Sequence, residues 1–465
     1  MEKRGARREF FEICCATWNI PLQISKIWRV CHPPLGTVEA LSQQTRLFFA
    51  QSVGLRPTSH GRFQEIQARS GGHPCPGLHA ATVDRCSKLV GISRWTSLPY
   101  PMQIRRISLH QLRRFATVEL QPTAGVNLLT GDNGAGKTSV LEALHLMAYS
   151  RSFRGRVRDG LIRQGQEALE VFVEWEETRA DRSEVRRKAG LRHSGQDWHG
   201  RLDGEDVAQL GTLCAALAVV TFEPGSHALV SGGGEPRRRF LDWGLFHVEP
   251  DFLPLWRRYS RALKQRNALL KQGGAPRMLD VWDRELAEAG EPLTGRRLLY
   301  LERLQERAMV LADALAPQLG IQGMALSAGW RRHEMSLADA LLLARDRDRQ
   351  AGYTSVGPHR ADWSVSFSAI PGRDALSRGQ AKLTALTCLL AQAEDYAEQR
   401  GHWPVIALDD LASELDRTHQ ARVLERLLAG PAQIFITATE LPAALEARTD
   451  ITRFHVEHGQ IQPVR

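Results

Sequence analysis

Long apolar runs are missing from this chain of 465 residues. No stretch approaches the roughly 20 apolar residues that a membrane-spanning helix needs, so we expect a protein without a membrane partner. Cysteine is scarce as well. Five of the seven cysteines fall within residues 1–101 and lack the spacing of metal ligands or of a disulfide framework. The other two, Cys214 and Cys388, have the apolar neighbours of small core residues, and so few thiols fit a reducing cytoplasm.

A strong charge of one sign is missing from most of the chain. The formal net charge is +9, but residues 1–101 carry 13 Lys and Arg against 6 Asp and Glu, and the remaining residues carry 48 against 46. Net charge is therefore poor evidence for nucleic-acid binding, and only local basic clusters count.

An orderly pattern is also absent before Met102. Residues 1–101 show neither helical periodicity nor the contiguous apolar core of a signal peptide. A strand-like pattern begins directly afterwards, at residues 103–109. We therefore expect Met102 to be the natural start and residues 1–101 to be a poorly ordered product of upstream translation. A genuine N-terminal extension is the alternative.

Three glycines are concentrated in one short segment. An apolar run, Val126–Thr130, leads into it, and residues 139–147 follow it with helical apolar spacing. A glycine-rich loop between a strand and a helix is typical of a P-loop. In a P-loop, backbone N–H groups cradle the phosphates of a nucleoside triphosphate. The alternative is a fortuitous glycine-rich turn. The predicted nucleotide-binding residues are Gly131, Asp132, Asn133, Gly134, Ala135, Gly136, Lys137 and Thr138.

Two acids complete this site from far downstream. Residues 403–410 form an apolar strand that ends in Asp409 and Asp410, as a buried parallel strand that delivers carboxylates to the P-loop would end. We predict that Lys137 and Asp410 are catalytic, with Asp410 orienting or deprotonating the attacking water. Thr138 and Asp409 are predicted to hold Mg²⁺ beside ATP. The alternative is a strand that ends in an acidic turn.

A polar pentapeptide at 376–380 precedes a helical run. It resembles the LSGGQ signature of the ABC ATPase superfamily, and residues 413–416 resemble the D-loop of that superfamily, with Ser413 and Asp416 in it. The resemblance implies an ATP-dependent homodimer in which each signature closes on the ATP of the other subunit. A polar helix cap is the alternative for the pentapeptide. The residues predicted to act in trans are Ser377, Arg378, Gly379 and Gln380.

Two positions depart from the superfamily pattern. Asp410 stands where most members have Glu, and the switch position offers Thr437 or Thr439 rather than His. A shorter base favours slow hydrolysis of ATP to ADP and phosphate, which suits a clamp better than a motor. A weak ATPase is therefore expected, and a scaffold that never hydrolyses its ATP is a rival.

Spacing defines the predicted domains. Lys137 and Ser377 are 240 residues apart, which is long for a transporter subunit and short for a long coiled coil. Residues 237–256 and 278–319 have helical apolar spacing. We predict an α/β fold, a P-loop ABC-type ATPase head from residues 102–231 and 331–465, with a short helical lobe inserted at 232–330. Gln164 and Gln166 are weak candidates for the glutamine loop of a transporter ATPase subunit, a rival reading.

Several longer segments resemble the bacterial RecF family closely, from Met102 to Arg465. They are GDNGAGKTSVLEAL at 131–144, SRSFR at 150–154, TFEPGSHALVSGGGEPRRRFLD at 221–242, SVGPHRADW at 355–363 and ALDDLASELD at 407–416. The resemblance implies a cytoplasmic, ATP-dependent DNA-binding dimer of recombinational gap repair, replication-fork maintenance and the SOS response, whose weak ATPase is stimulated by DNA. It also implies action with RecO and RecR at single-strand gaps or junctions to promote RecA loading. An SMC-like head that tethers DNA ends is the rival.

Two arginine groups are candidate DNA contacts. One comprises Arg151, Arg154, Arg156 and Arg158, after the P-loop helix, and the other Arg105, Arg106, Arg113 and Arg114. Such groups contact phosphate backbones. Neither group is interleaved with aromatics as a stacking platform would be, and Phe153 is the near candidate for stacking, so contact with duplex backbone is favoured over stacking with single strands. A solvated basic face is the alternative for each group.

Overall fold

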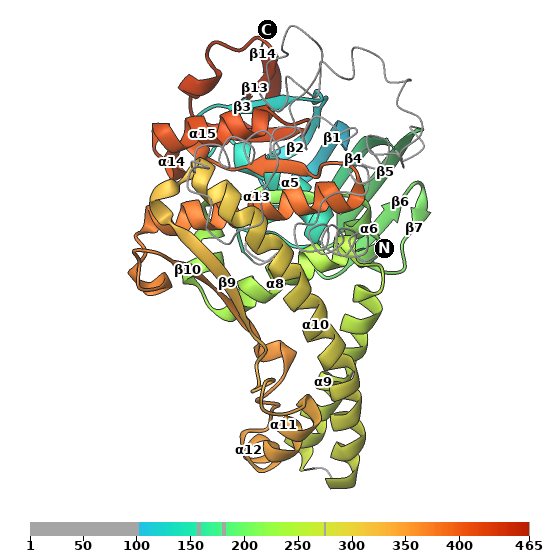
Figure 1. The fold of residues 1–465 in the computed structure, drawn as a ribbon. Helices are drawn as coiled ribbons and strands as arrows, with labels where there is room; N and C mark the ends of the chain where they lie inside the picture. Colours follow the sequence, from blue (N-terminus) through green and yellow to red (C-terminus); the bar gives the residue numbers. More distant parts are fainter. Residues whose placement is uncertain (1–101, 156–159, 179–182, 274–275, 465) are drawn as a thin grey trace, which may run out of the picture. The chain divides into compact units, whose positions relative to one another are not determined.

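Residues 102–155, 160–178, 183–273 and 276–464 are described by the computed structural model (Figure 1), and the predicted N-terminal extension lies outside them. The first part supplies an antiparallel sheet with the strand order β2 (Phe115–Leu120), β1 (Gln103–Leu112), β4 (Leu169–Thr178), β5 (Glu184–His193), β6 (Trp198–Leu202) and β7 (Glu205–Asp206). In β4, Val171, Val173 and Trp175 are buried and alternate with more exposed residues. This period of two is typical of a sheet with one covered face.

A second sheet combines segments from distant parts of the chain. Its order is β14 (Gln460–Val464), β13 (Ile451–Glu457), β3 (Val126–Thr130), β12 (Ile434–Ala438), β11 (Val405–Leu408) and β8 (Val219–Phe222). All neighbours are parallel except β13 and β14. The strands β3, β8, β11 and β12 are wholly buried, as expected of parallel strands covered on both faces. The predicted strands before the P-loop and before the two acids are confirmed.

The P-loop helix α5 (Lys137–Tyr149) lies between the two sheets (Figure 1). It contacts β4 of the antiparallel sheet and β8 and β12 of the parallel sheet. Because both sides are covered, the helix is buried nearly all round, from Ser139 to Ala148. The P-loop helix is therefore held in a buried hydrophobic cluster to which both sheets contribute.

Helices cover the other face of the parallel sheet, where α13 (Arg378–Arg400) contacts β8. On this side lie α7 (Ala228–Ser231), α8 (Gly234–Val248), α14 (Leu411–Glu414) and α15 (Arg417–Leu428), whereas α6 (Leu210–Ala216) packs against α5 and β6. Cys214 and Cys388 are buried, as predicted. No helix within the described part of the chain combines the length and apolar character that crossing a membrane requires.

A helical lobe is built on α9 (Phe252–Gln272) and α10 (Pro276–Leu315), which pack side by side (Figure 1). The apolar spacing over 237–256 predicts continuous helix, but α8 ends at Val248. The correction has a local cause, because Pro250 offers no backbone N–H and disfavours helix at Glu249, whose φ and ψ are −113° and 107°.

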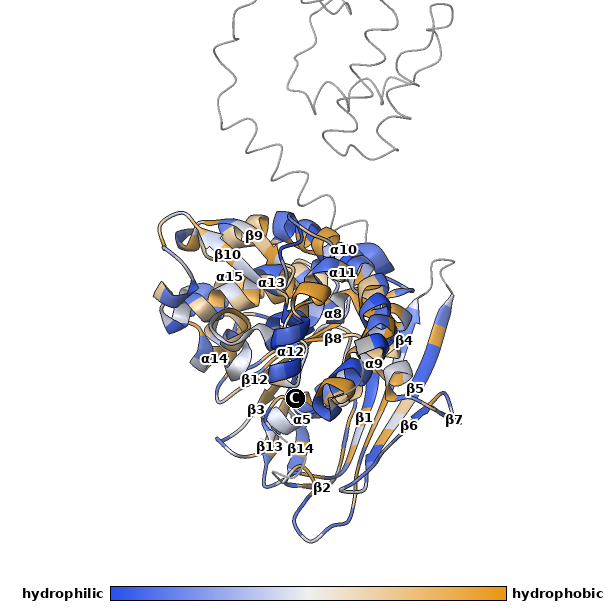
Figure 2. Ribbon diagram, turned by 90° about the horizontal axis from the view of Figure 1, so that it is seen from below, coloured by the Kyte–Doolittle hydropathy of each residue, from blue (hydrophilic) through white to orange (hydrophobic). Residues whose placement is uncertain are grey.

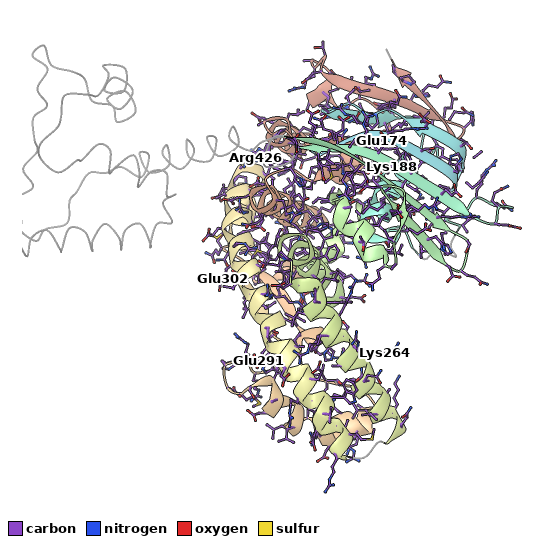
Figure 3. The ribbon with its side chains drawn as sticks, turned by 90° about the vertical axis from the view of Figure 1, so that its right-hand side faces the viewer. Glu174, Lys188, Lys264, Glu291, Glu302 and Arg426 are labelled. Atoms are coloured by element: carbon purple, nitrogen blue, oxygen red, sulfur yellow. The ribbon has the colours of Figure 1, made fainter. Side chains whose placement is uncertain are left out.

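Two short helices, α11 (Leu337–Leu343) and the hydrophilic α12 (Arg345–Ala351; Figure 2), pack against α10 and α9 respectively. The side chain of Glu291 on α10 (Figure 3) accepts the N–H of Leu337 at 2.8 Å. The strand before these helices, β9 (Ile321–Ser327), and the strand after them, β10 (Asp362–Phe367), pair as a two-stranded antiparallel sheet.

Candidate nucleotide site

The P-loop turns at two glycines. At either position, the Cβ of any other residue would collide with neighbouring atoms. Gly131 has a φ of 143°, and a Cβ there would lie 2.1 Å from the carbonyl oxygen of Val456. Gly136 has a φ of 123°, and a Cβ there would lie 2.9 Å from Cζ of Phe115. The close approach of β13 and β2 explains why the loop needs glycine at both positions.

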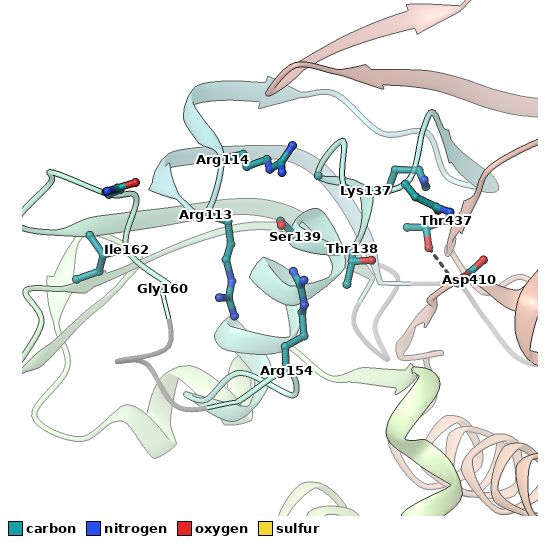
Figure 4. A pocket seen from close by; sticks show the side chains of 14 residues that line it. Arg113, Arg114, Lys137, Thr138, Ser139, Arg154, Gly160, Ile162, Asp410 and Thr437 are labelled. Carbon is teal, nitrogen blue, oxygen red and sulfur yellow. Dashed lines mark hydrogen bonds between the residues drawn. The ribbon is translucent and has the colours of Figure 1, made fainter.

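The loop opens into a cavity of about 650 Å³, called here the P-loop cavity. Figure 4 shows its wall, to which five segments of the chain contribute. The lining residues are Arg113, Arg114, Asn133, Gly134, Gly136, Lys137, Thr138, Ser139, Arg154, Gly160, Ile162, Gln164, Asp410 and Thr437. The predicted P-loop and the second predicted acid therefore meet at one site.

Lys137 lies across the loop. Its ammonium group donates to the carbonyl oxygens of Gly131 at 2.6 Å and of Asp132 at 2.9 Å, and the residue is only 8% exposed. Burial lowers the pKa of Lys137, and the carboxylates of Asp410 and Asp409 counter part of this effect. The cation is thus held at the cavity wall beside the loop.

Asp409 joins the P-loop helix to β11 and β12. Its Oδ1 accepts the hydroxyls of Thr138 at 2.9 Å and of Thr437 at 2.7 Å, and the residue is 2% exposed. Burial raises the pKa of Asp409, while these two hydrogen bonds oppose the rise. A buried carboxylate beside a threonine hydroxyl supplies the hard oxygen ligands that Mg²⁺ prefers. Within the described residues, no cluster of three or more His, Cys, Asp or Glu could hold a metal ion.

Asp410 is strained by its backbone. Its φ and ψ of 50° and 46° are left-handed, which is uncommon for a residue with a Cβ. The N–H of Asp410 donates to Thr437 Oγ1 at 2.8 Å, and its Oδ2 accepts the hydroxyl of Ser413 at 2.5 Å. Of the two threonines considered for the switch position, Thr437 lines the cavity and Thr439 is exposed.

The predicted signature caps α13. The Ser377 hydroxyl accepts the N–H of Gln380 at 3.2 Å, and the Gln380 side chain accepts the N–H of Ser377 at 2.9 Å. This reciprocal pair is a capping box, and Arg378 and Gly379 lie between its two members. None of these four residues is among the described residues that line the P-loop cavity of the same chain.

The predicted D-loop forms α14 and the start of α15. Asp416 caps α15 by accepting the N–H of His419 at 3.0 Å. A salt bridge of 2.7 Å between Lys382 on α13 and Glu414 on α14 links the signature helix to the D-loop. The two segments are therefore mechanically connected, although they are separated in sequence.

The arginines predicted as DNA contacts lie in different surroundings. Arg105 pairs with Glu176 and Arg106 with Glu119, each at 2.7 Å, on the antiparallel sheet. The guanidinium of Arg151 lies over the ring of Tyr149, 5.9 Å from its centroid. Arg156 and Arg158 lie outside the described residues. That these arginines bind DNA stays a prediction.

Sequence reasoning missed how some residues join the nucleotide site. Arg113, Arg114 and Arg154 were grouped as candidate DNA contacts, yet all three line the P-loop cavity. Gln164, considered only for a transporter, lines it too. No local pattern reveals this, because the turn between β1 and β2 reaches the loop only through packing of the antiparallel sheet on α5.

Comparison with protein-family models matches residues 103–462 to the RecF/RecN/SMC N terminal domain. The DNA replication and repair protein RecF of Stenotrophomonas maltophilia (strain R551-3) is 84% identical over 363 residues, which are 78% of this chain and 100% of that protein. The chain belongs to the RecF family. The RecF of Shewanella oneidensis is 35% identical over 364 residues, covering 77% of this chain and 99% of that RecF. RecF relatives are named DNA replication and repair proteins, so the coarse function expected from the resemblance is confirmed.

Solved structures of RecF agree with the fold. The structure of the recombination mediator protein RecF-ATPrS in the RecFOR pathway has a TM-score of 0.68 at 25% identity, covering 79% of this chain and 99% of that chain. The RecF-ATP structure has the same TM-score and identity, and the match covers 79% of this chain and 98% of that chain. The P-loop ABC-type ATPase head with an inserted short helical lobe is thus confirmed as the fold class.

Proposed function

We propose that this RecF-family chain is an ATP-dependent DNA-binding clamp. In this proposal it acts in recombinational gap repair, in replication-fork maintenance and in the SOS response. It binds single-strand to double-strand junctions or gapped duplex in the cytoplasm and acts with RecO and RecR to promote RecA loading. The observation that carries the proposal is the 2.9 Å contact between Thr138 and Asp409, which joins the P-loop to the acidic strand. The ATP named in the RecF-ATP structure supports the same nucleotide here.

The chain's own residues suit the binding and hydrolysis of ATP. Backbone N–H groups of the loop and the Lys137 ammonium would neutralise the phosphates, and Thr138 and Asp409 would hold Mg²⁺. Bound Mg²⁺ supplies charge neutralisation at the β- and γ-phosphates. Asp410 would orient the attacking water and accept its proton, since its carboxylate lines the cavity. Slow hydrolysis is expected, because Asp410 is a short base and its backbone is held in a left-handed turn.

Dimerisation would complete the site. Ser377 to Gln380 cap α13 outside the cavity of their own chain, so a second subunit would have to supply the signature. Two heads closed on two ATP molecules would enclose DNA, and hydrolysis would reopen them. The sequence divides the chain into a head of residues 102–231 and 331–465 and a helical lobe of residues 232–330. We keep this division except for α11 and α12, which we move from the head to the lobe because they pack on α10 and α9.

The test is the mass of the full chain in solution by light scattering. Asp410→Asn should slow hydrolysis while leaving ATP binding intact, so this variant should double in mass with ATP and Mg²⁺. Gapped duplex should then be retained. Asp374→Asn, at an exposed position outside the cavity, serves as the matched control. A monomer under every condition would refute the clamp.

Hydrolysis and partners are tested separately. Phosphate release should be slow and should rise when DNA is added, whereas a scaffold that binds ATP only structurally would release none. Crosslinking to RecR is expected from the clamp. Crosslinking to a nuclease instead would favour an SMC-like tether of DNA ends.

A further inference from the structure

Glu142 is a buried carboxylate behind the wall of the P-loop cavity. It lies on α5, and its side chain has no exposed surface. Arg113 donates two hydrogen bonds to it, from Nε to Oε2 at 3.0 Å and from Nη2 to Oε1 at 2.7 Å. The Ser152 hydroxyl donates to Oε1, and Nη1 of Arg154 lies 3.6 Å from Oε2. One acid thus gathers side chains from two loops onto the P-loop helix.

Both arginines line the P-loop cavity, whereas Glu142 does not. Figure 4 shows Arg113 and Arg154 reaching α5 from separate parts of the ribbon. Arg113 comes from the turn between β1 and β2, with a φ of 54°, and Arg154 from the loop after α5. A guanidinium on a flexible stem loses conformational entropy when it is held in one direction, so a fixed partner is needed to aim it. Glu142 is that partner for both.

The two arginines are held to different degrees. Arg113 is 15% exposed and makes a bidentate pair, so its orientation is fixed. Arg154 is 44% exposed, and 3.6 Å is too long for a good hydrogen bond, so its donors remain available to the cavity. Its backbone N–H is anchored on the Ser152 hydroxyl at 3.0 Å.

We infer that Glu142 is a positioning residue for nucleotide binding, which acts by aiming Arg113 and Arg154 at the phosphates in the P-loop cavity. The inference rests on the proposed binding of ATP. Glu142 touches no nucleotide itself. Its loss should therefore weaken binding through the arginines, while Asp409 and Asp410 stay in place.

Glu142→Gln tests this with little change in volume. The amide loses the charge and turns N–H donors towards the arginine donors, so the Kd for ATP should rise about tenfold or more, as expected when charge-assisted hydrogen bonds are lost. Calorimetric titration of the full chain with ATP and Mg²⁺ measures it. The KM for ATP should rise while kcat changes little. Glu119→Gln, which breaks an exposed pair with Arg106 outside the cavity, is the matched control and should bind ATP normally.

A double-mutant cycle shows whether Glu142 orients the arginines or only stabilises the fold. Arg154→Ala alone should raise the Kd, and adding it to Glu142→Gln should change the Kd much less, because the arginine is already misdirected. Fully additive losses, or an unchanged Kd in folded Glu142→Gln, would overturn the inference. If Glu142→Gln does not fold, Glu142→Asp keeps the charge, and the same cycle with Arg154→Ala decides. A wild-type chain that does not bind ATP would refute the proposed function instead.

Discussion

The Thr437 hydroxyl donates to Asp409 Oδ1 at 2.7 Å and accepts the N–H of Asp410 at 2.8 Å. One buried side chain near the end of β12 therefore holds both acids that end β11. It fixes the carboxylate predicted to bind Mg²⁺ and supports the left-handed turn that aims Asp410 into the cavity.

Thr437→Val should preserve the shape of this site but remove both hydrogen bonds. We expect kcat for ATP hydrolysis to fall about tenfold or more, which corresponds to about 1.4 kcal/mol of lost transition-state stabilisation. Thr437→Ser, which keeps the hydroxyl, should retain most of the activity. Thr439→Val changes an exposed threonine two residues further along and is the control. Wild-type rates for Thr437→Val would show that the hydroxyl does not organise the acids.

Mixing two inactive variants tests the predicted signature in trans. Lys137→Ala removes the P-loop cation, and Ser377→Arg places bulk at the α13 cap. Each variant alone should release little phosphate with ATP and DNA. An equimolar mixture should recover about a quarter of the wild-type rate, because half of the dimers are mixed and each has one intact composite site. No recovery at any ratio would argue that each chain completes its own site.

Elements with strong periodicity were predictable from the sequence. The buried run Val126–Thr130, the glycine-rich turn and the apolar strand before Asp409 each carry a local pattern. In the structure the two strands lie on either side of β12 and run parallel to it, so the turn and Asp409 follow at the same end of the sheet. The break before α9 was also visible in principle, because Pro250 lies inside the periodic stretch. Residues that are close in sequence determine these elements, so their pattern in the sequence is enough to predict them.

The rest of the site depends on tertiary packing. Arg113 and Arg154 look like surface arginines in sequence, since no pattern around them indicates that one buried acid, Glu142, holds both. Gln164 reaches the cavity only because the chain after α5 returns beside the turn between β1 and β2, where the N–H of Arg113 donates to Leu161 at 2.9 Å. Such tertiary contacts leave no repeating pattern in the sequence, so they cannot be predicted from it.

Buried histidines predict how stability depends on pH. Burial lowers the pKa of His145 and His247 to about 3 and of His359 and His402 to about 4. The unfolded chain titrates these groups near 6.5, so between 6.5 and about 4 it binds protons that the folded chain does not. Stability is therefore complete above 6.5 and falls as the pH decreases, by about 1.4 kcal/mol per pH unit for each histidine.

The melting temperature measured across this window gives the test. His145→Gln should flatten the decline, because it removes one group that must stay neutral in the fold. His333→Gln changes an exposed histidine and should leave the slope unaltered. A melting temperature that is constant from pH 6.5 to about 4 would contradict the neutral, buried state of these rings.

Arg266 ties the far end of the helical lobe together. Fully buried on α9, it donates from Nε to Asp283 Oδ1 on α10 at 2.5 Å and from Nη1 to Asp348 Oδ2 on α12 at 2.7 Å. It also donates to the Thr354 hydroxyl at 3.0 Å. Arg345 on α12 also donates to Asp283 Oδ2, at 2.7 Å, so two arginines hold α12 against α9 and α10, and Arg266 is the buried one.

Arg266→Met keeps much of the side-chain volume but leaves the buried Asp348 without its cation, whereas Asp283 keeps Arg345. We expect the free energy of unfolding to fall by about 3–5 kcal/mol, because a buried charge that loses its partner keeps its full desolvation penalty. Urea denaturation measures this, with Lys264→Met at an exposed position on the same helix (Figure 3) as the control. Adding Asp348→Leu to Arg266→Met should recover part of the loss, since one unpaired carboxylate is removed. If the double variant is no more stable than Arg266→Met, unpaired charge is not the cause, and lost packing around α12 would explain the effect instead.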